Sequence, residues 1–210
     1  MEINAREFDD IARIMFKPIY PVIADQILDY TNITEGCCLD IGCGGGYLGI
    51  ELARASNLAI CFLDQSRDML EIVKRNIADN ELQGRGETIL ANVEKIPLPD
   101  SSVNLAVSRG SVFFWDDLVQ AFREIYRVLA PGGMTYIGGG FGSAGLKEEI
   151  NSRWRNNHKG RAEWQKMARR NLGPDTPRKF GQALKDAAIP NYELVHSEER
   201  GLWIVIRKES

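Results

Sequence analysis

The fold is decided by the stretch Leu39-Asp40-Ile41-Gly42-Cys43-Gly44-Gly45-Gly46-Tyr47-Leu48-Gly49. The apolar run at 37–41 is typical of a central buried strand, and a helix is predicted from about Tyr47 to Ser56. A glycine-dense turn between them lets the backbone pass within contact distance of a ligand, because no Cβ stands in the way. The stretch therefore predicts a strand–turn–helix unit with a ligand at the turn. A tight turn without a ligand is the alternative.

The rest of the chain alternates short apolar runs with helix-period segments, which predicts parallel strands joined by crossover helices. The predicted strands lie at 37–41, 58–63, 87–90, 103–107 and 134–137, followed by a hairpin at 192–196 and 202–206. The expected fold class is α/β, a Rossmann-like doubly wound sheet of seven strands. The sheet should be mostly parallel, with an antiparallel C-terminal hairpin and helices on both faces.

Helix boundaries can be placed from capping residues. Ser66 is predicted to cap one helix and Asp116 another, which Pro131-Gly132-Gly133 should end. A helix is also expected at about 176–188, and the polar stretch 143–171 is predicted to be helical.

Composition places the chain among globular proteins with a single core. It has 210 residues, and 26 Lys and Arg against 29 Asp and Glu give a net charge of -3. This balance does not predict a general polyanion-binding surface. No apolar run approaches the ~20 residues that span a bilayer, and the acidic start does not resemble an export leader, so a cytoplasmic protein is expected.

The four cysteines fit neither a zinc site nor a disulfide framework, so no metal is expected. Cys37, Cys38 and Cys61 are interpreted as small apolar core residues. Cys43 differs because it lies inside the glycine turn.

Asp64 strengthens the case for a ligand at this turn. It ends the second predicted strand, 20 residues beyond Gly44, so both strand ends should open onto the same edge of the sheet. A carboxylate there can accept hydrogen bonds from both hydroxyls of a ribose. Because Gly44-x-Gly46-x-x-Gly49 also matches the dinucleotide-binding pattern, the residues alone leave the choice of nucleoside cofactor open.

Four motifs carry a family resemblance: CLDIGCGGGYLGIELA, FLDQSRDML, ANVEKIPLPDSSVNLAVS and AFREIYRVLAPGGMTYI. With them the chain resembles the class I S-adenosylmethionine-dependent methyltransferases, in the small-molecule branch that includes the ubiquinone and menaquinone C-methyltransferases (the methyltransferase type 11 domain). The resemblance covers roughly residues 36–137. It implies S-adenosyl-L-methionine as cofactor and S-adenosyl-L-homocysteine as product.

The resemblance also implies roles for single residues. Gly42, Cys43 and Gly44 match the loop that faces the methionine part, and Asp40 matches the acidic residue that positions this loop or the amino group. Asp64 matches the ribose ligand. The remaining matches are Gln65 and Met69 beside the adenine, Asn92-Val93 at the adenine edge, where the family commonly has Asp, and Ser108 and Arg109 near the methionine end.

The resemblance further implies a division of one domain, 1–210. Residues 1–35 are expected to form an N-terminal helical lid and 36–140 the cofactor-binding core. An acceptor-side helical insert at 141–188 and the hairpin at 189–210 complete the domain.

The acceptor should lie near the segment that follows the fourth strand. There Phe113, Phe114 and Trp115 stand between Arg109 and Asp116, and they could wall a pocket for a flat or apolar acceptor, with Arg109 pairing an acidic group. Alternatively, Phe113 and Trp115 pack under the next helix and Arg109 forms a structural ion pair. Phe16 and Tyr20 are candidate lid residues or core residues.

A basic run at 151–180 and His158 complete the candidates. The run is either a solvated helix face or a docking surface for an anionic acceptor, a partner protein or RNA. His158 is a candidate base or a structural residue. The leading hypothesis is methyl transfer to a small-molecule acceptor that is partly apolar or anionic. RNA or protein methylation, and cofactor binding without catalysis on the same fold, are the alternatives.

Overall fold

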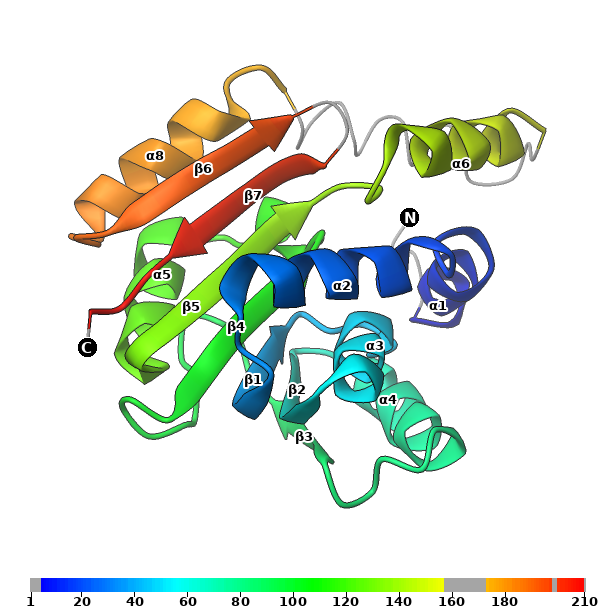
Figure 1. Cartoon of the computed structure of the whole chain (residues 1–210), viewed down its shortest axis with the longest axis horizontal. Coiled ribbons are helices and arrows are strands. Elements are labelled where there is room, and N and C mark those ends of the chain that lie inside the picture. The colour runs from blue at the N-terminus through cyan, green and yellow to red at the C-terminus, as the bar shows by residue number, and fades with distance from the viewer. Residues whose placement is uncertain (1–4, 157–172, 198–199, 210) are drawn as a thin grey trace.

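One mixed β-sheet forms the centre of the molecule in the computed structural model, which describes residues 5–156, 173–197 and 200–209 (Figure 1). The strand order is β3-β2-β1-β4-β5-β7-β6. The strands are β1 (Glu35–Ile41), β2 (Asn57–Asp64), β3 (Gly86–Leu90), β4 (Val103–Arg109), β5 (Leu129–Gly139), β6 (Tyr192–Ser197) and β7 (Gly201–Ile206). Neighbours from β3 to β5 are parallel, whereas β7 runs antiparallel to β5 and β6. The predicted seven-stranded sheet with an antiparallel C-terminal hairpin is confirmed.

Helices cover both faces of this sheet, as the doubly wound class requires (Figure 1). On one face, α2, α3 and α4 contribute buried apolar side chains such as Ile23, Leu52 and Val73. On the other face, α5 and α8 contribute Phe122 and Leu184. These helices are α2 (Ile19–Thr31), α3 (Tyr47–Ala55), α4 (Arg67–Asp79), α5 (Leu118–Val128) and α8 (Thr176–Asp186).

The remaining helical segments are α1 (Ala5–Met15), α6 (Ala144–Asn156) and the short 3-10 turn η1 (Ser111–Phe114). β5 runs toward the end of the molecule at which α1 and α6 lie (Figure 1). The parallel strands thus present their carboxyl ends to these segments. The expected helix at 143–171 is confirmed over 144–156, and residues 157–171 lie outside the described residues.

Several boundaries differ from the prediction. Asp117 rather than Asp116 caps α5, because its Oδ1 accepts the Gln120 N–H at 2.9 Å while its own N–H donates to Glu94. The predicted cap at Ser66 is confirmed, with Oγ accepting the Met69 N–H at 3.3 Å. Pro131-Gly132-Gly133 does not end the helix, since α5 ends at Val128 and these residues lie within the bounds of β5. There β5 shifts register against β4, a bulge that the positive φ of Gly132 fits.

The strand order places a ligand crevice between β1 and β4. Connections lead from β1 to β2 and β3 on one side and from β4 to β5 on the other, so the order reverses between these two strands. In open α/β sheets, ligands bind outside the carboxyl ends of the strands at such a switch point. Asp40, Asp64 and Arg109 all lie at this carboxyl edge.

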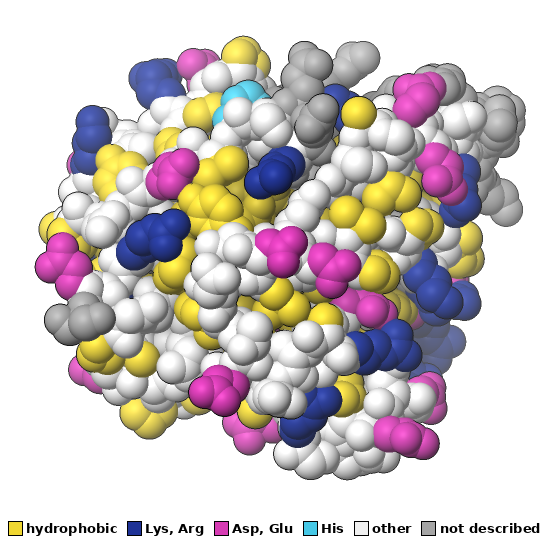
Figure 2. Space-filling view, in the orientation of Figure 1, with side chains coloured by type: hydrophobic (Ala, Val, Ile, Leu, Met, Phe, Trp, Pro, Cys, Tyr) yellow, Lys and Arg dark blue, Asp and Glu magenta, His cyan; other side chains and the backbone are white. Residues whose placement is uncertain are grey.

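The surface of the described residues carries both signs of charge. Figure 2 shows Lys and Arg interspersed with Asp and Glu over the face covered by α2, with hydrophobic side chains between them. Within the described ranges no helix combines the length and apolar character needed to cross a bilayer.

Candidate functional site

The glycine loop joins the ends of the two central strands. The N–H groups of Gly42 and Cys43 both donate to the carbonyl of Leu63, at 2.7 and 3.1 Å. Gly42, Gly44 and Gly46 have φ of 62°, 54° and 79°, a left-handed backbone that other residues rarely adopt. At Gly42 a Cβ would also collide with the side chain of Ser111. The loop is therefore a backbone cradle that depends on glycine.

Asp64 holds this loop against the end of β2. Its Oδ2 accepts the N–H of Gly44 at 3.0 Å, and its Oδ1 accepts the N–H of Ser66 at 2.8 Å. Burial raises the pKa of this carboxyl, and the backbone hydrogen bonds act against that shift. An ionised carboxylate offers about four lone-pair sites, so both oxygens keep capacity for hydroxyl donors. Gly44 and Asp64 thus lie together at one edge, as their spacing predicts.

Asp40 is the second buried carboxyl and lies near the end of β1, just before the loop. Its Oδ2 accepts the N–H of Gly49 at 3.0 Å, which ties the end of β1 to the first turns of α3. Burial raises the pKa of Asp40 to about 7, although the Gly49 hydrogen bond opposes the shift. This contact holds the strand and helix on either side of the cradle.

The residues matched to the adenine lie at the ends of β2 and β3. Met69 and Val93 are buried, whereas Gln65 and Asn92 are exposed. The side-chain oxygen of Asn92 accepts the N–H of Glu94 at 2.9 Å, so it is used in a local turn. Leu90, which pairs with Asp64 across the strands, is 46% exposed and adds an apolar side chain that the sequence did not single out.

α1 covers the glycine loop. A Cβ at Gly44 would lie 3.7 Å from Cε1 of Phe8, and the hydroxyl of Tyr47 donates to Asp9 Oδ1 at 2.7 Å. Both α1 residues escaped the sequence analysis because only the fold brings them to the loop. Their position is compatible with the expected lid at 1–35.

Arg109 lies among aromatic side chains from the N-terminal helices. Its Cζ is 4.4 Å from the ring centroid of Phe16 and 5.6 Å from that of Tyr20, distances typical of cation–π contacts. Tyr20 in turn stacks on Tyr47 at 5.5 Å. Phe16 and Tyr20 are thus brought together with Arg109, which is distant from them in sequence, and both rings are buried in the core. The alternative of a structural ion pair is not seen, since no carboxylate of the described residues pairs with Arg109.

The three consecutive aromatic residues diverge instead of forming one wall. Phe113 packs against Phe180 with ring centroids 5.9 Å apart, and Trp115 packs against Phe122 at 6.2 Å. Phe114 alone points outward and is 52% exposed. Trp115 therefore packs against the next helix, α5, as the alternative predicts, whereas Phe113 packs against α8 instead and Phe114 remains exposed at the surface.

Ser111 lies against Gly42 of the glycine loop, and the sequence did not single it out. Its hydroxyl donates to the carbonyl of Ile41 at 2.8 Å, lies 2.6 Å from Ser108 Oγ and accepts Trp115 Nε1–H at 3.2 Å. Ser108 is fully buried, so its side chain serves this network. The serine ties the end of β1 to the turn that follows β4.

The basic run shows no concentrated positive patch where it is described. Arg153 pairs with Glu149 at 2.6 Å, and Arg178 lies 3.5 Å from Asp175. All four of these side chains are well exposed, which is typical of a solvated helix face. His158 lies outside the described residues.

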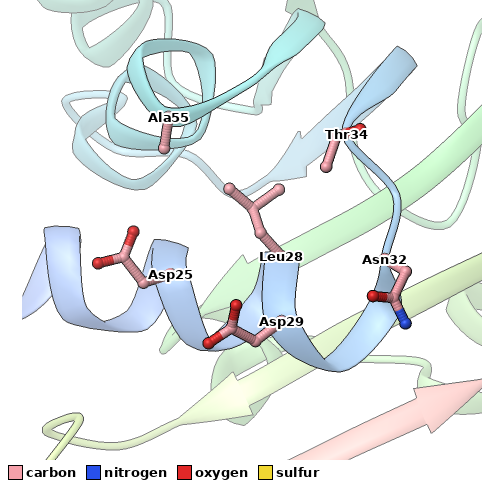
Figure 3. A pocket seen from close by; sticks show the side chains of 6 residues that line it. All are labelled: Asp25, Leu28, Asp29, Asn32, Thr34 and Ala55. Atoms are coloured by element: carbon pink, nitrogen blue, oxygen red, sulfur yellow. The ribbon is translucent and has the colours of Figure 1, made fainter.

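A surface hollow lies between α2 and the end of α3 (Figure 3). It is lined by Asp25, Leu28, Asp29, Asn32, Thr34 and Ala55. Thr34 precedes β1, so the hollow is at the amino edge of the sheet, away from the glycine loop.

Comparison with known proteins agrees with this geometry. The family described as "Methyltransferase domain" matches residues 39–137. A crystal structure from Methanococcus maripaludis, named as that of a candidate S-adenosyl-L-methionine-dependent methyltransferase, is 41% identical with a TM-score of 0.91, covering 100% of this chain and 98% of that one.

Curated relatives match over a shorter range. A malonyl-[acyl-carrier protein] O-methyltransferase from Serratia marcescens is 30% identical over 55% of this chain and 42% of its own length. A ubiquinone/menaquinone biosynthesis C-methyltransferase from Geotalea daltonii is 33% identical over 49% of this chain and 45% of its own length. The chain thus spans less than half the length of these two relatives.

The fold and the glycine cradle define a class I methyltransferase. The chain belongs to the S-adenosylmethionine-dependent methyltransferase family. The cofactor of this family is S-adenosyl-L-methionine, as the sequence predicted.

Proposed function

We propose that the chain transfers a methyl group from S-adenosyl-L-methionine to a small-molecule acceptor by in-line displacement. The observation that carries this proposal is the buried Asp64 carboxylate, hydrogen-bonded to the glycine cradle at the switch point of the sheet. The cradle leaves no room for a Cβ at Gly42, and the oxygens of Asp64 have capacity for hydroxyl donors. These features fit a nucleoside with a ribose.

The roles of the cofactor residues follow from their positions. Asp64 would bind the ribose hydroxyls, and Gly42, Cys43 and Gly44 would face the methionine part. Gln65, Met69, Asn92 and Val93 would border the adenine, for which the apolar surface of Leu90 adds a contact. Asp40 would act indirectly, by holding α3 on β1.

When bound, S-adenosyl-L-methionine supplies a methyl group already activated by a sulfonium, and it leaves as S-adenosyl-L-homocysteine. The task of the chain is then to align an acceptor atom with the methyl carbon, which can lower the barrier by roughly 7–11 kcal/mol. Phe16, Tyr20 and Arg109 border the carboxyl edge on the acceptor side, together with exposed Phe114. A partly apolar or anionic small molecule suits these side chains. His158 remains a candidate base from the sequence alone.

Isothermal titration calorimetry with S-adenosyl-L-homocysteine tests the proposal. Asp64→Ala should weaken binding by about 1.5–3 kcal/mol, or about 10- to 150-fold, because a charge-assisted contact is lost. Asp79→Ala, at the exposed end of α4, is the control and should leave the affinity unchanged. Equal affinities in the parent chain and Asp64→Ala would contradict the assignment. Stabilisation against heat by NAD but not by S-adenosyl-L-homocysteine would overturn the choice of cofactor.

RNA or protein methylation is not favoured by any described residue of the basic run, because Arg153 and Arg178 lie beside carboxylates of their own segments. Cofactor binding without methyl transfer to any acceptor would assign the chain to the non-catalytic alternative.

A further inference from the structure

Arg109 is the one cation that β4 carries to the carboxyl edge. Its guanidinium lies over the rings of Phe16 and Tyr20, and Nη2 donates to the carbonyl of Gly140 at 3.3 Å. Nε is buried and has no hydrogen-bond partner among the described residues. Arg109 as a residue is half-buried, and it ends β4 at the carboxyl edge of the sheet.

The charge of Arg109 is poorly compensated compared with that of Arg127. The guanidinium of Arg127 contacts the carboxylates of Asp100 and Glu124 and the carbonyls of Leu98 and Ile96, all within 2.9 Å. Arg109 has two aromatic faces, a 3.3 Å hydrogen bond to Gly140 and the hydroxyl of Tyr20 as a polar neighbour, but no carboxylate among the described residues. Burial lowers the pKa of its guanidinium, and Tyr20 opposes that shift. A cation removed from water is costly unless an anion compensates it, and cation–π contacts return only part of that cost.

The position of Arg109 connects it to the cofactor side. Tyr20, which contacts the guanidinium, stacks on Tyr47, the first residue of α3 after the glycine loop. Two residues beyond Arg109, Ser111 lies directly beneath Gly42. A group bound by Arg109 is therefore held beside the cradle, and the buried rings of Phe16 and Tyr20 lie behind the guanidinium.

We propose that Arg109 binds an oxyanion of the acceptor, a carboxylate or a phosphate, while the buried rings of Phe16 and Tyr20 hold the guanidinium in place. This inference rests on the proposed function and narrows its acceptor to an acidic small molecule. The planar fork of a guanidinium suits this role, because it offers two parallel N–H donors to two oxygens. Arg109 anchors the acceptor and exchanges no proton with it.

Transfer of a labelled methyl group tests the inference. Small metabolites extracted from the source cells are separated by ion exchange into anionic, neutral and cationic fractions. Each fraction is incubated with the chain and methyl-labelled S-adenosyl-L-methionine, and labelled products are detected by mass spectrometry. Label should enter products only from the anionic fraction. Competition by added acetate or by inorganic phosphate then distinguishes a carboxylate from a phosphate.

Arg109→Gln should lower the transfer by about 10- to 150-fold, because a hydrogen-bonded charge pair is lost, and Arg109→Lys should recover part of it. Affinity for S-adenosyl-L-homocysteine, measured by calorimetry, shows that each variant is folded. Arg85→Gln is the matched control. Arg85 also binds backbone carbonyls, those of Ala53 and Ser56, but at the opposite edge of the sheet, so transfer should persist.

Three outcomes distinguish a failure of the proposed role of Arg109 from a failure of the proposed function. Label from the neutral or cationic fraction, or full transfer by Arg109→Gln, would overturn the role of Arg109 and leave the proposed function intact. Cofactor binding without label from any fraction would instead remove the proposed function, and this inference with it. If Arg109→Gln fails to bind S-adenosyl-L-homocysteine, the fraction that supplies the label and the activity of Arg109→Lys decide the question.

Discussion

The two sides of the carboxyl edge hold their charges by different means. On the proposed cofactor side, defined by Asp40, the glycine loop and Asp64, each carboxylate accepts hydrogen bonds from backbone N–H groups. On the proposed acceptor side, defined by Phe16, Tyr20 and Arg109, a guanidinium lies against two rings from the N-terminal segment. Backbone donors are positioned by one strand–turn–helix unit, whereas the guanidinium depends on the docking of the N-terminal helices. The cofactor side is therefore a local structure and the acceptor side a tertiary one.

Ionisation of the buried Asp40 carboxyl should have the largest effect on the free energy of unfolding. Burial raises the pKa of Asp40 to about 7, whereas a carboxyl in the unfolded chain titrates near ~4. Between these values the folded state retains a proton that the unfolded state has lost, so the free energy of unfolding falls as the pH rises. The loss from this group should reach about 4 kcal/mol and be complete slightly above pH 7.

Urea unfolding of the parent chain and Asp40→Asn at pH 5 and pH 8 measures this effect. Asparagine cannot ionise at this position. Between pH 5 and pH 8 the free energy of unfolding of Asp40→Asn should therefore fall by about 3 kcal/mol less than that of the parent chain. Asp79→Asn, at the exposed end of α4, is the control and leaves both Asp40 and Asp64 in place. An equal decrease in the parent chain and in Asp40→Asn would show that backbone donors compensate the buried charge fully.

Gly42→Ala tests how strictly the cofactor side depends on its backbone. A left-handed alanine costs about 1–2 kcal/mol, and the collision with Ser111 adds about 1–3 kcal/mol, so the free energy of unfolding should drop by about 2–5 kcal/mol. Gly84→Ala is the matched control, because no atom lies within 4 Å of its Cβ position and its φ is not left-handed. It should be neutral or slightly stabilising. Similar losses in both variants would count against a special loop conformation.

Tyr47→Phe gives the smallest effect and tests the link between the two sides. It removes the hydrogen bond to Asp9 that holds α1 on the loop, at a cost of about 1 kcal/mol, while the ring contact with Tyr20 persists. Hydrogen exchange should become faster in α1 and stay unchanged in β1. Tyr126→Phe, whose hydroxyl has no hydrogen bond among the described residues, should change neither. Unchanged exchange in α1 would show that this helix docks through its other contacts.

Much of the fold was accessible from the sequence because strands and crossover helices carry their own periodicity. The positions of the strands, the C-terminal hairpin and the Ser66 cap follow from local patterns. The boundary between α5 and β5 could not be placed from the sequence. Pro131-Gly132-Gly133 indicates only that no helix continues through 131–133, and α5 already ends at Val128. Pairing of Leu129 with Val103 draws the strand back to that residue.

By itself, the sequence determined the glycine cradle, the carboxylate at the end of β2 and the family, because these depend on residues within one contiguous unit. Only the tertiary structure decided which of the three consecutive aromatic residues face the core, that Ser111 lies under Gly42, and that Phe16 and Tyr20 enclose Arg109. The reason is physical. A backbone turn is specified by the φ and ψ preferences of its own residues, whereas the surroundings of a side chain depend on how distant helices pack.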